Sequence, residues 1–153
     1  MLRQQLNDAL KTAMRNRDQI TLSTIRLILA AIKDRDIQAR TQGRADGLSD
    51  QEILQLLQTL VKQRREAISL YEKGGRVELC EREQAEIAVI EQFLPRQFSE
   101  VETEQAVKEL LDELGAHALK DMGRVMSELR GRYAGQMDFG KASSVVKKCL
   151  AGS

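Results

Sequence analysis

The sequence predicts an all-α protein. Leu, Ala, Glu, Gln, Lys and Arg dominate its 153 residues, and aromatic residues make up only 3%. This is the composition of helices rather than of sheets. Pro95 is the only proline, so long segments on both sides of it can remain helical. Apolar residues also recur every three or four positions, which is the period of an amphipathic helix.

Two helices are predicted at the N-terminus. The apolar residues of segment 2–14 recur at helical spacing and define the first helix. Asp18 can cap the second, because its carboxylate can accept a hydrogen bond from an amide left open at a helix start. The second helix has an apolar stripe over residues 22–32. It ends in the charged run 33–40, before a loop with two glycines.

A third and a fourth helix are predicted next. Ser49 and Glu52 have the spacing of a capping box, in which the hydroxyl and the carboxylate each accept a hydrogen bond from a backbone amide. The third helix then runs until Gly74 stops it. The fourth is expected over residues 77–94, again with an apolar stripe.

Pro95 marks the expected domain boundary. Proline has no amide proton to donate, and it disfavours a helical conformation at the residue before it. We therefore expect a larger N-terminal helical domain of about four helices over residues 1–95. A small helical domain is expected over residues 96–153.

The small domain is predicted to contain three short helices. Ser99 and Glu102 form a second capping box, and Gly115 is placed to close the helix that follows. Asp121 and Asp138 can cap the two remaining helices, each of which has its own apolar stripe.

Four glycines cluster in the stretch "KDMGRVMSELRGRYAGQMDFGK", residues 120–141. Gly131 and Gly135 are expected to end helices, and Gly123 to let another helix approach closely, because glycine has no Cβ. The alternative is a phosphate bound at the open amides of a helix start beside a glycine. No dinucleotide fingerprint or P-loop occurs, so we expect no nucleotide cofactor, and no cofactor of any kind.

Charge is polarised along the last third of the chain, although the net charge of the whole is only +1. Residues 117–153 have seven Lys and Arg against three Asp and Glu, whereas residues 99–116 have one Lys against six acids. Such polarity could steer an RNA backbone to the small domain. The alternative is a solvated surface whose charges complement the helix ends. The RNA-binding candidates are Lys120, Gly123, Arg124, Arg130, Arg132, Lys141, Lys147 and Lys148.

Arg64 lies on the apolar face of the third helix, where an unpaired charge would be costly to bury. Glu83, and less directly Glu86, falls on or beside the inward stripe of the fourth helix. We expect a structural ion pair between Arg64 and these acids that fixes the helix register. A catalytic carboxylate activated by burial is the alternative.

The chain offers few residues for other chemistry. Cys80, Cys149 and His117 do not have metal-site spacing, so we expect no metal. No candidate for nucleophilic catalysis has a neighbouring base, and no catalytic residue is assigned. Neither a leader segment nor a membrane-spanning run is apparent, so we expect no contact with a membrane and a cytoplasmic location.

Three blocks resemble one family of small bacterial proteins. They are "IRLILAAIKD" at residues 25–34, "KQRREAISLYEKGGRVELCEREQAEIAVIEQFLP" at 62–95 and "KDMGRVM" at 120–126. In this order they are similar to the YqeY family (GatB/YqeY domain). That family is related to the C-terminal tail of the GatB component of the aspartyl/glutamyl-tRNA amidotransferase, a tail that engages tRNA. The resemblance implies a helical larger domain, a three-helix small domain and a contact surface at the "KDMGRVM" element.

Three functional hypotheses follow. The first is a non-catalytic module that binds tRNA or another RNA through the basic segment and accompanies translation-related proteins. The second is a helical protein-interaction module. The third, an autonomous carbon–nitrogen ligase that takes its nitrogen from glutamine, is the weakest. The resemblance places the amidase and the phosphorylating domain of that chemistry outside this chain.

Overall fold

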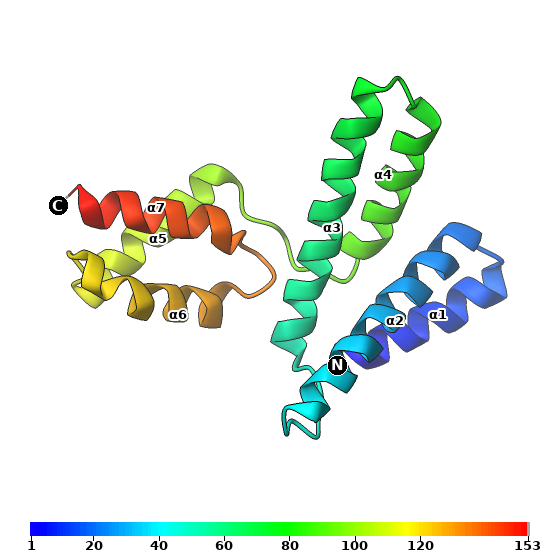
Figure 1. Ribbon diagram of the computed structural model, residues 1–153, viewed down its shortest axis with the longest axis horizontal. Coiled ribbons are helices and arrows are strands. Elements are labelled where there is room, and N and C mark those ends of the chain that lie inside the picture. Colours follow the sequence, from blue (N-terminus) through cyan, green and yellow to red (C-terminus); the bar gives the residue numbers. More distant parts are fainter. Residues whose placement is uncertain (153) are drawn as a thin grey trace. The chain divides into compact units, whose positions relative to one another are not determined.

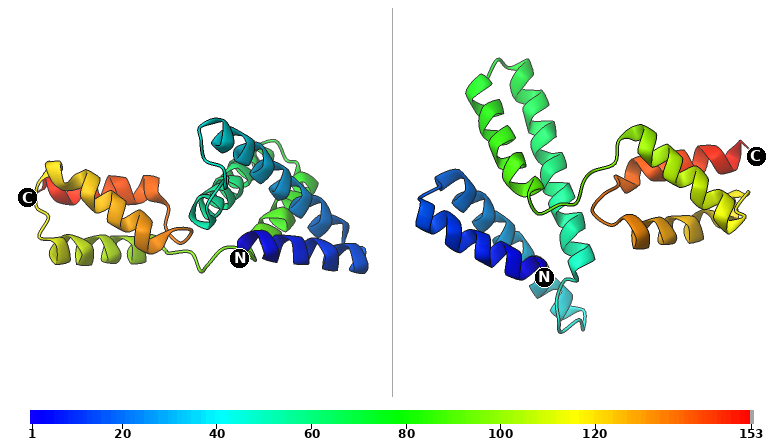
Figure 2. Two further views of the ribbon diagram at one scale, coloured as in Figure 1. Left: turned by 90° about the horizontal axis from the view of Figure 1, so that it is seen from below. Right: turned by 180° about the vertical axis from the view of Figure 1, so that it is seen from behind.

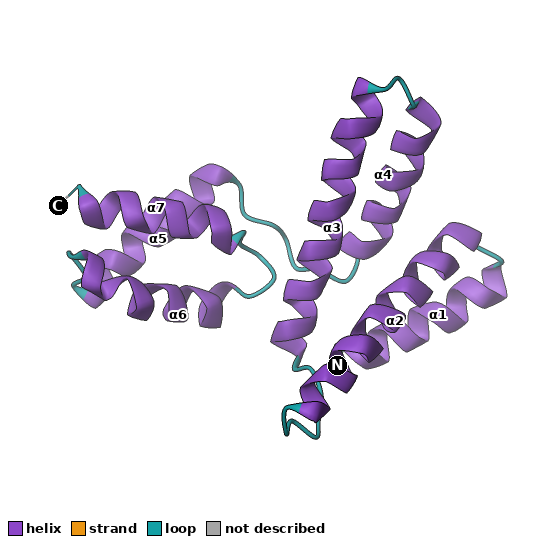
Figure 3. Cartoon of the chain, in the orientation of Figure 1, coloured by secondary structure: helices purple, strands orange, loops and turns teal. Residues whose placement is uncertain are grey.

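All regular structure in residues 1–152, the part of the chain described by the computed structural model, is helical, and no strand occurs there (Figure 3). The all-α prediction is therefore confirmed. In chain order the elements are α1 (Leu2–Asn16), α2 (Gln19–Thr41), α3 (Asp50–Lys73), α4 (Val77–Glu91), α5 (Glu100–Leu114), the 3-10 turn η1 (Leu119–Asp121), α6 (Met122–Tyr133) and α7 (Phe139–Ala151).

The residues group into two units by their contacts, Met1–Pro95 and Arg96–Ser153. The larger unit consists of two helical hairpins, α1 with α2 and α3 with α4, joined mainly where α2 packs against α4. The hairpins meet near the start of α1 and diverge toward their turns, as the front and rear views show (Figures 1 and 2).

The core of the larger unit forms where the four helices converge. Its fully buried side chains include Leu6, Ile28, Leu57 and Ile90, one from each helix. Burying a Leu or Ile side chain of this kind contributes about 1.5–3 kcal/mol each. Met14, which ends the predicted stripe of the first helix, is instead 52% exposed. In the last turn of α1, Ala13 rather than Met14 is the buried residue.

Most predicted helix ends are confirmed. The Asp18 carboxylate accepts from Thr21 N–H at the start of α2, and the capping box of Ser49 forms at the start of α3. α2 continues through the charged run 33–40, because that run also places buried side chains on the inward face. α4 ends at Glu91, three residues before its predicted end. Its last residues turn with i→i−3 hydrogen bonds instead, as expected just before a proline.

The small unit packs α5, α6 and α7 around a second apolar core. The predicted capping box of Ser99 starts α5, and Gly115 ends it with a left-handed φ of 64°. The segment before α5 is held by two hydrogen bonds, from Phe98 N–H to the Gln136 carbonyl (2.8 Å) and from the Gln97 amide to the Gly135 carbonyl. The buried core consists of Ala106, Val107, Leu110, Leu111, Val125, Met126, Leu129, Met137, Ala142, Val146 and Leu150.

Candidate nucleic-acid interface

The seven basic residues of the predicted site lie on three consecutive elements of the small unit. One is in η1, three are arginines of α6 and three are lysines of α7. All seven are exposed, but they differ in their contacts with acids. They are Lys120, Arg124, Arg130, Arg132, Lys141, Lys147 and Lys148.

Arg132 is engaged in ion pairs. Its Nη1 and Nη2 donate to the two carboxylate oxygens of Glu113 on α5 at 2.8 and 2.7 Å, and its Nε donates to Glu128 at 3.0 Å. Hydrogen bonding to Arg132 lowers the pKa of Glu113, and the two acids raise the pKa of Arg132. This guanidinium links α6 to α5, so its charge is already balanced.

Arg124 and Lys141 are also close to acids, although less tightly. Arg124 Nη2 lies 3.5 Å from Asp121 Oδ1 and donates to the Leu114 carbonyl at 3.3 Å. Lys141 Nζ lies 3.8 Å from Glu100 Oε1, between two exposed side chains. Exposed pairs of this kind are weak, so both cations can be redirected to another anion.

Three lysines have no carboxylate at hand. Lys120, Lys147 and Lys148 have no ion-pair partner within residues 1–152. η1 packs against α7, so Lys120 is held beside the helix that bears the other two lysines. No acidic residue occurs between positions 139 and 151, the whole of α7. Arg130, the remaining cation, extends across the ring of Phe139, with its Cζ 5.8 Å from the ring centroid.

The "KDMGRVM" element differs from its prediction in two respects. A Cβ added to Gly123 would meet no atom within 4 Å, so no helix approaches it closely. Asp121 does not cap α6 with its side chain. Its carboxylate accepts instead from the backbone amides of His117 and Ala118, which lowers the pKa of Asp121. The acid therefore orders the turn before α6.

Gly131 does not end a helix. It lies inside α6, which continues to Tyr133, and an added Cβ there would also meet nothing within 4 Å. Gly135 does follow the end of α6, with a left-handed φ of 80° that favours glycine. Of the two glycines in segment 120–141 that are predicted to end helices, Gly135 alone is confirmed.

Arg64 is buried between α3 and α4. Its Nε lies 2.9 Å from Glu86 Oε2 and 3.9 Å from Glu83 Oε2, and its Nη1 donates to the Leu60 carbonyl at 3.1 Å. The structure thus brings together the three predicted residues, with Glu86 rather than Glu83 as the nearer acid. Arg82, 3.5 Å from Glu86, adds a second cation on the exposed side.

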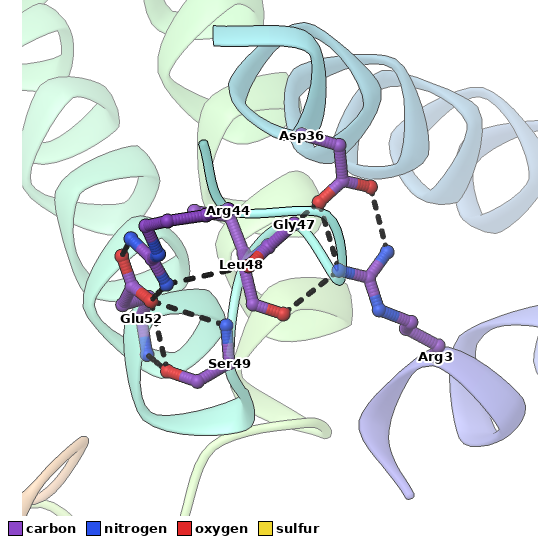
Figure 4. Close-up of polar contacts among 7 residues, drawn as sticks. All are labelled: Arg3, Asp36, Arg44, Gly47, Leu48, Ser49 and Glu52. Carbon is purple, nitrogen blue, oxygen red and sulfur yellow. Dashed lines mark hydrogen bonds and ion pairs between the residues drawn. The ribbon is translucent and has the colours of Figure 1, made fainter. Parts of the chain in front are cut away.

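The larger unit also contains a polar cluster that sequence reasoning did not find (Figure 4). Arg3 donates from Nη1 and Nη2 to the two oxygens of Asp36, each at 2.8 Å, and from Nη2 to the Leu48 carbonyl at 2.9 Å. Leu48 N–H in turn donates to Asp36 Oδ1 at 2.8 Å. We call these three residues the Arg3 clasp; it joins α1, α2 and the loop before α3.

The Asp36 side chain is only 10% exposed. The hydrogen bonds from Arg3, and then from Leu48, lower the pKa of Asp36 to about 2, although burial opposes the shift. The sequence does contain one indication that Asp36 is buried. Asp36 follows Ile32 by four positions and so falls on the inward stripe of α2. Its partners could not be identified that way, since one of them is a loop backbone.

The loop that carries Leu48 is shaped by its neighbours. Gly47 has a left-handed φ of 74°, and a Cβ there would overlap the Asp36 carboxylate. Arg44 pairs with Glu52, the acid of the capping box, and this contact and Ser49 N–H lower the pKa of Glu52 to about 2 (Figure 4). The loop between α2 and α3 is therefore fixed at both of its ends.

Other sites are limited within the part of the chain that the structure describes. No group of three or more His, Cys, Asp or Glu side chains is arranged there to hold a metal ion. Cys80 is buried and donates to the Ile68 carbonyl, and burial raises the pKa of its thiol. None of the helices described is both long and apolar enough to cross a membrane.

Several curated relatives of the chain share one name. The chain is 36% identical to the altered inheritance of mitochondria protein 41, mitochondrial, of Lachancea thermotolerans. The match extends over 111 residues, which are 71% of this chain and 57% of that protein. The chain is 35% identical to the protein of that name from Eremothecium gossypii over 58% of this chain and 46% of the relative. For Saccharomyces cerevisiae the identity is 31%, over 74% of this chain and 60% of the relative.

The chain thus spans about half the length of the curated relatives it matches. A family model gives the more complete match, since the one described as Yqey-like protein covers residues 3–150, nearly the whole chain and both units. This chain belongs to the YqeY-like family.

Proposed function

We propose that the chain is a non-catalytic accessory module that binds the phosphate backbone of tRNA or a related RNA through η1 and α7 of its small unit. One observation supports this most directly. Lys120, Lys147 and Lys148 are exposed and have no acid partner among the described residues, and α7 contains no acid. Counterions released from phosphates by such lysines supply most of the sequence-independent affinity for nucleic acid.

Family kinship supports the same partner. The YqeY family resembles the amidotransferase tail that engages tRNA, and the chain belongs to that family. The proposed surface also includes Lys120, the first residue of the "KDMGRVM" element. Arg132 is left out, because Glu113 and Glu128 already balance its charge.

The aromatic side chains favour backbone contact over base reading. Tyr133 packs on Phe98, with ring centroids 5.2 Å apart, and Phe139 lies beneath Arg130. Single-stranded RNA is read mainly by stacking bases on open aromatic rings. With both rings occupied, recognition would rest on the shape and charge of a folded RNA.

The test is a fluorescence anisotropy titration of the full chain with uncharged and aminoacylated tRNA over a series of salt concentrations. Three phosphate contacts predict a slope of log K against log salt of about −2 to −3. The variant Lys147→Glu with Lys148→Glu is expected to weaken binding by about tenfold or more, with an unchanged circular dichroism spectrum.

Two controls make the test specific. Lys11→Glu with Lys62→Glu has the same charge change on exposed positions of the larger unit and should leave affinity within about twofold. Arg132→Ala should likewise leave affinity unchanged, because that guanidinium is engaged with acids. Absent binding, binding independent of salt, or an equal loss in the Lys11 and Lys62 control would each overturn the proposal.

A further inference from the structure

A groove opens between the two hairpins of the larger unit. It has a volume of about 470 Å³ and lies between the first turns of α2 and one face of α4. Figure 1 shows these two helices on the facing arms of the diverging hairpins. The α2 wall consists of Gln19, Ile20 and Ser23, and the charged residues of the α4 wall are Glu78, Glu81, Arg82 and Glu86.

The α4 side of the groove is acidic. Glu86 is already paired with Arg64 and Arg82, but Glu78 and Glu81 have no ion-pair partner in residues 1–152. The charges of Glu78 and Glu81 also act on Cys80. Burial is the main cause that raises the pKa of the Cys80 thiol, and these two acids are among the charges that raise it further. Arg82, which also lines the groove, is paired with Glu86, so the negative charges of Glu78 and Glu81 are left uncompensated.

The α2 side of the groove has one exposed apolar residue, Ile20, between Gln19 and Ser23. Ile20 is 47% exposed, and Leu27, seven residues later on the same face of the helix, is 44% exposed. Apolar residues at such spacings are what one helix presents to another. The buried stripe of α2 follows a different face of the helix, so Ile20 and Leu27 remain open to solvent.

We propose that this groove binds a basic amphipathic helix of a partner protein, with its apolar stripe on Ile20 and Leu27 and its Lys or Arg residues toward Glu78 and Glu81. Charge complementarity selects this occupant, since the acids would repel the phosphates of RNA or of an anionic membrane. The helix-in-groove mode suits a site that offers exposed apolar residues beside a charged wall. This surface lies in a different unit from the proposed RNA site and is independent of it.

The probe is a fluorescein-labelled helical peptide of about 18 residues built from Leu and Lys in an amphipathic pattern. Anisotropy titrations use the full chain, and two further peptides serve as references, one of scrambled order and one with Glu in place of Lys. The amphipathic basic peptide is expected to bind at least about tenfold more tightly than either.

Variants locate the binding site. Glu78→Lys with Glu81→Lys should weaken binding of the basic peptide by about tenfold or more. Glu104→Lys with Glu109→Lys, an equal charge change on the exposed face of α5, should leave it within about twofold. Ile20→Ser with Leu27→Ser should also weaken binding, and thermal melts of both groove variants verify that the fold is kept.

Three results would overturn the proposal. The first is equal binding of the scrambled peptide, which would reduce the effect to unspecific charge. The second is undiminished binding to the Glu78 and Glu81 variant. The third is self-association of the chain in sedimentation equilibrium that Ile20→Ser with Leu27→Ser abolishes, because the face of α2 would then belong to a contact between two copies.

Discussion

The Arg3 clasp and the Arg132 pairs use the same chemistry in two different settings. Both are bidentate contacts of one guanidinium with one carboxylate. The acid of the clasp, Asp36, is 10% exposed and also accepts from a backbone amide, whereas Glu113 is 55% exposed. The two arginines are similarly exposed, at 39% and 36%, so the difference lies in the acids. Water screens the Glu113 carboxylate more than the Asp36 carboxylate, so the same geometry should give different contributions to stability.

The largest effect is expected for Asp36→Ala. The substitution leaves the Leu48 amide and the Arg3 guanidinium without their acceptor, which should lower the free energy of unfolding by about 3 kcal/mol. Urea denaturation followed by circular dichroism measures the loss. Glu113→Ala, the matched change in the small unit, is expected to cost only a small fraction of it. Equal losses in the two variants would show that burial does not separate the pairs.

Acid should act on the clasp next most strongly. The pKa of Asp36 is about 2 in the folded state, against about 4 in the unfolded chain. The clasp therefore contributes its full stability above pH about 4, and this stability is lost as the pH falls through about 2. The expected loss from Asp36 is about 2 kcal/mol. Urea midpoints of the native chain and of Asp36→Asn should therefore converge below pH about 4. Glu52 titrates in the same window, so the difference between the two proteins is the quantity to follow.

Arg64 provides an intermediate case, since Glu86 and Glu83 are 17% and 21% exposed. Arg64→Met keeps most of the side-chain volume and is expected to cost about 1.5 kcal/mol, because Glu86 retains Arg82. Adding Glu86→Leu should not increase this loss, as two partners removed together leave fewer unpaired groups. Fully additive losses in this double-mutant cycle would mean that the two residues do not depend on each other.

The smallest expected effect is a gain in stability from replacing a glycine. Gly131→Ala should raise the free energy of unfolding by about 0.5–1 kcal/mol, because the position is helical and an added Cβ has open space. Gly47→Ala should lower it, since its φ is left-handed and Asp36 occupies the space. Thermal melts of both variants provide the measurement. A loss of stability in Gly131→Ala would show that this glycine has a role in α6 that the space around it does not reveal.

Local signals explain which features the sequence could predict. The capping boxes of Ser49 and Ser99 and the apolar stripes depend on residues three to eight positions apart, so they can be read in one dimension. Arg64 indicated an ion pair with the fourth helix, because a charge on an apolar helix face needs a partner when it is buried. These signals fix the helices and much of their pairing.

The features that were missed depend on contacts between distant segments. Asp36 could be placed on the inward face of α2, but its partners are 33 and 12 residues away in sequence. The roles expected of Gly123 and Gly131 depend on the residue type and its place in a helix, and neither reveals that the space around both glycines is open. Charge counts likewise could not distinguish Lys147 from Arg132, because they do not show which cations face an acid.

The hydrogen bond from Leu48 N–H to Asp36 makes a loop amide part of the helical framework. Loop amides normally exchange their hydrogen with solvent in brief local openings. This one can exchange only when Asp36 releases it, so its deuterium uptake should follow the separation of α1, α2 and the loop. A single backbone resonance would thereby report on the junction of both hairpins.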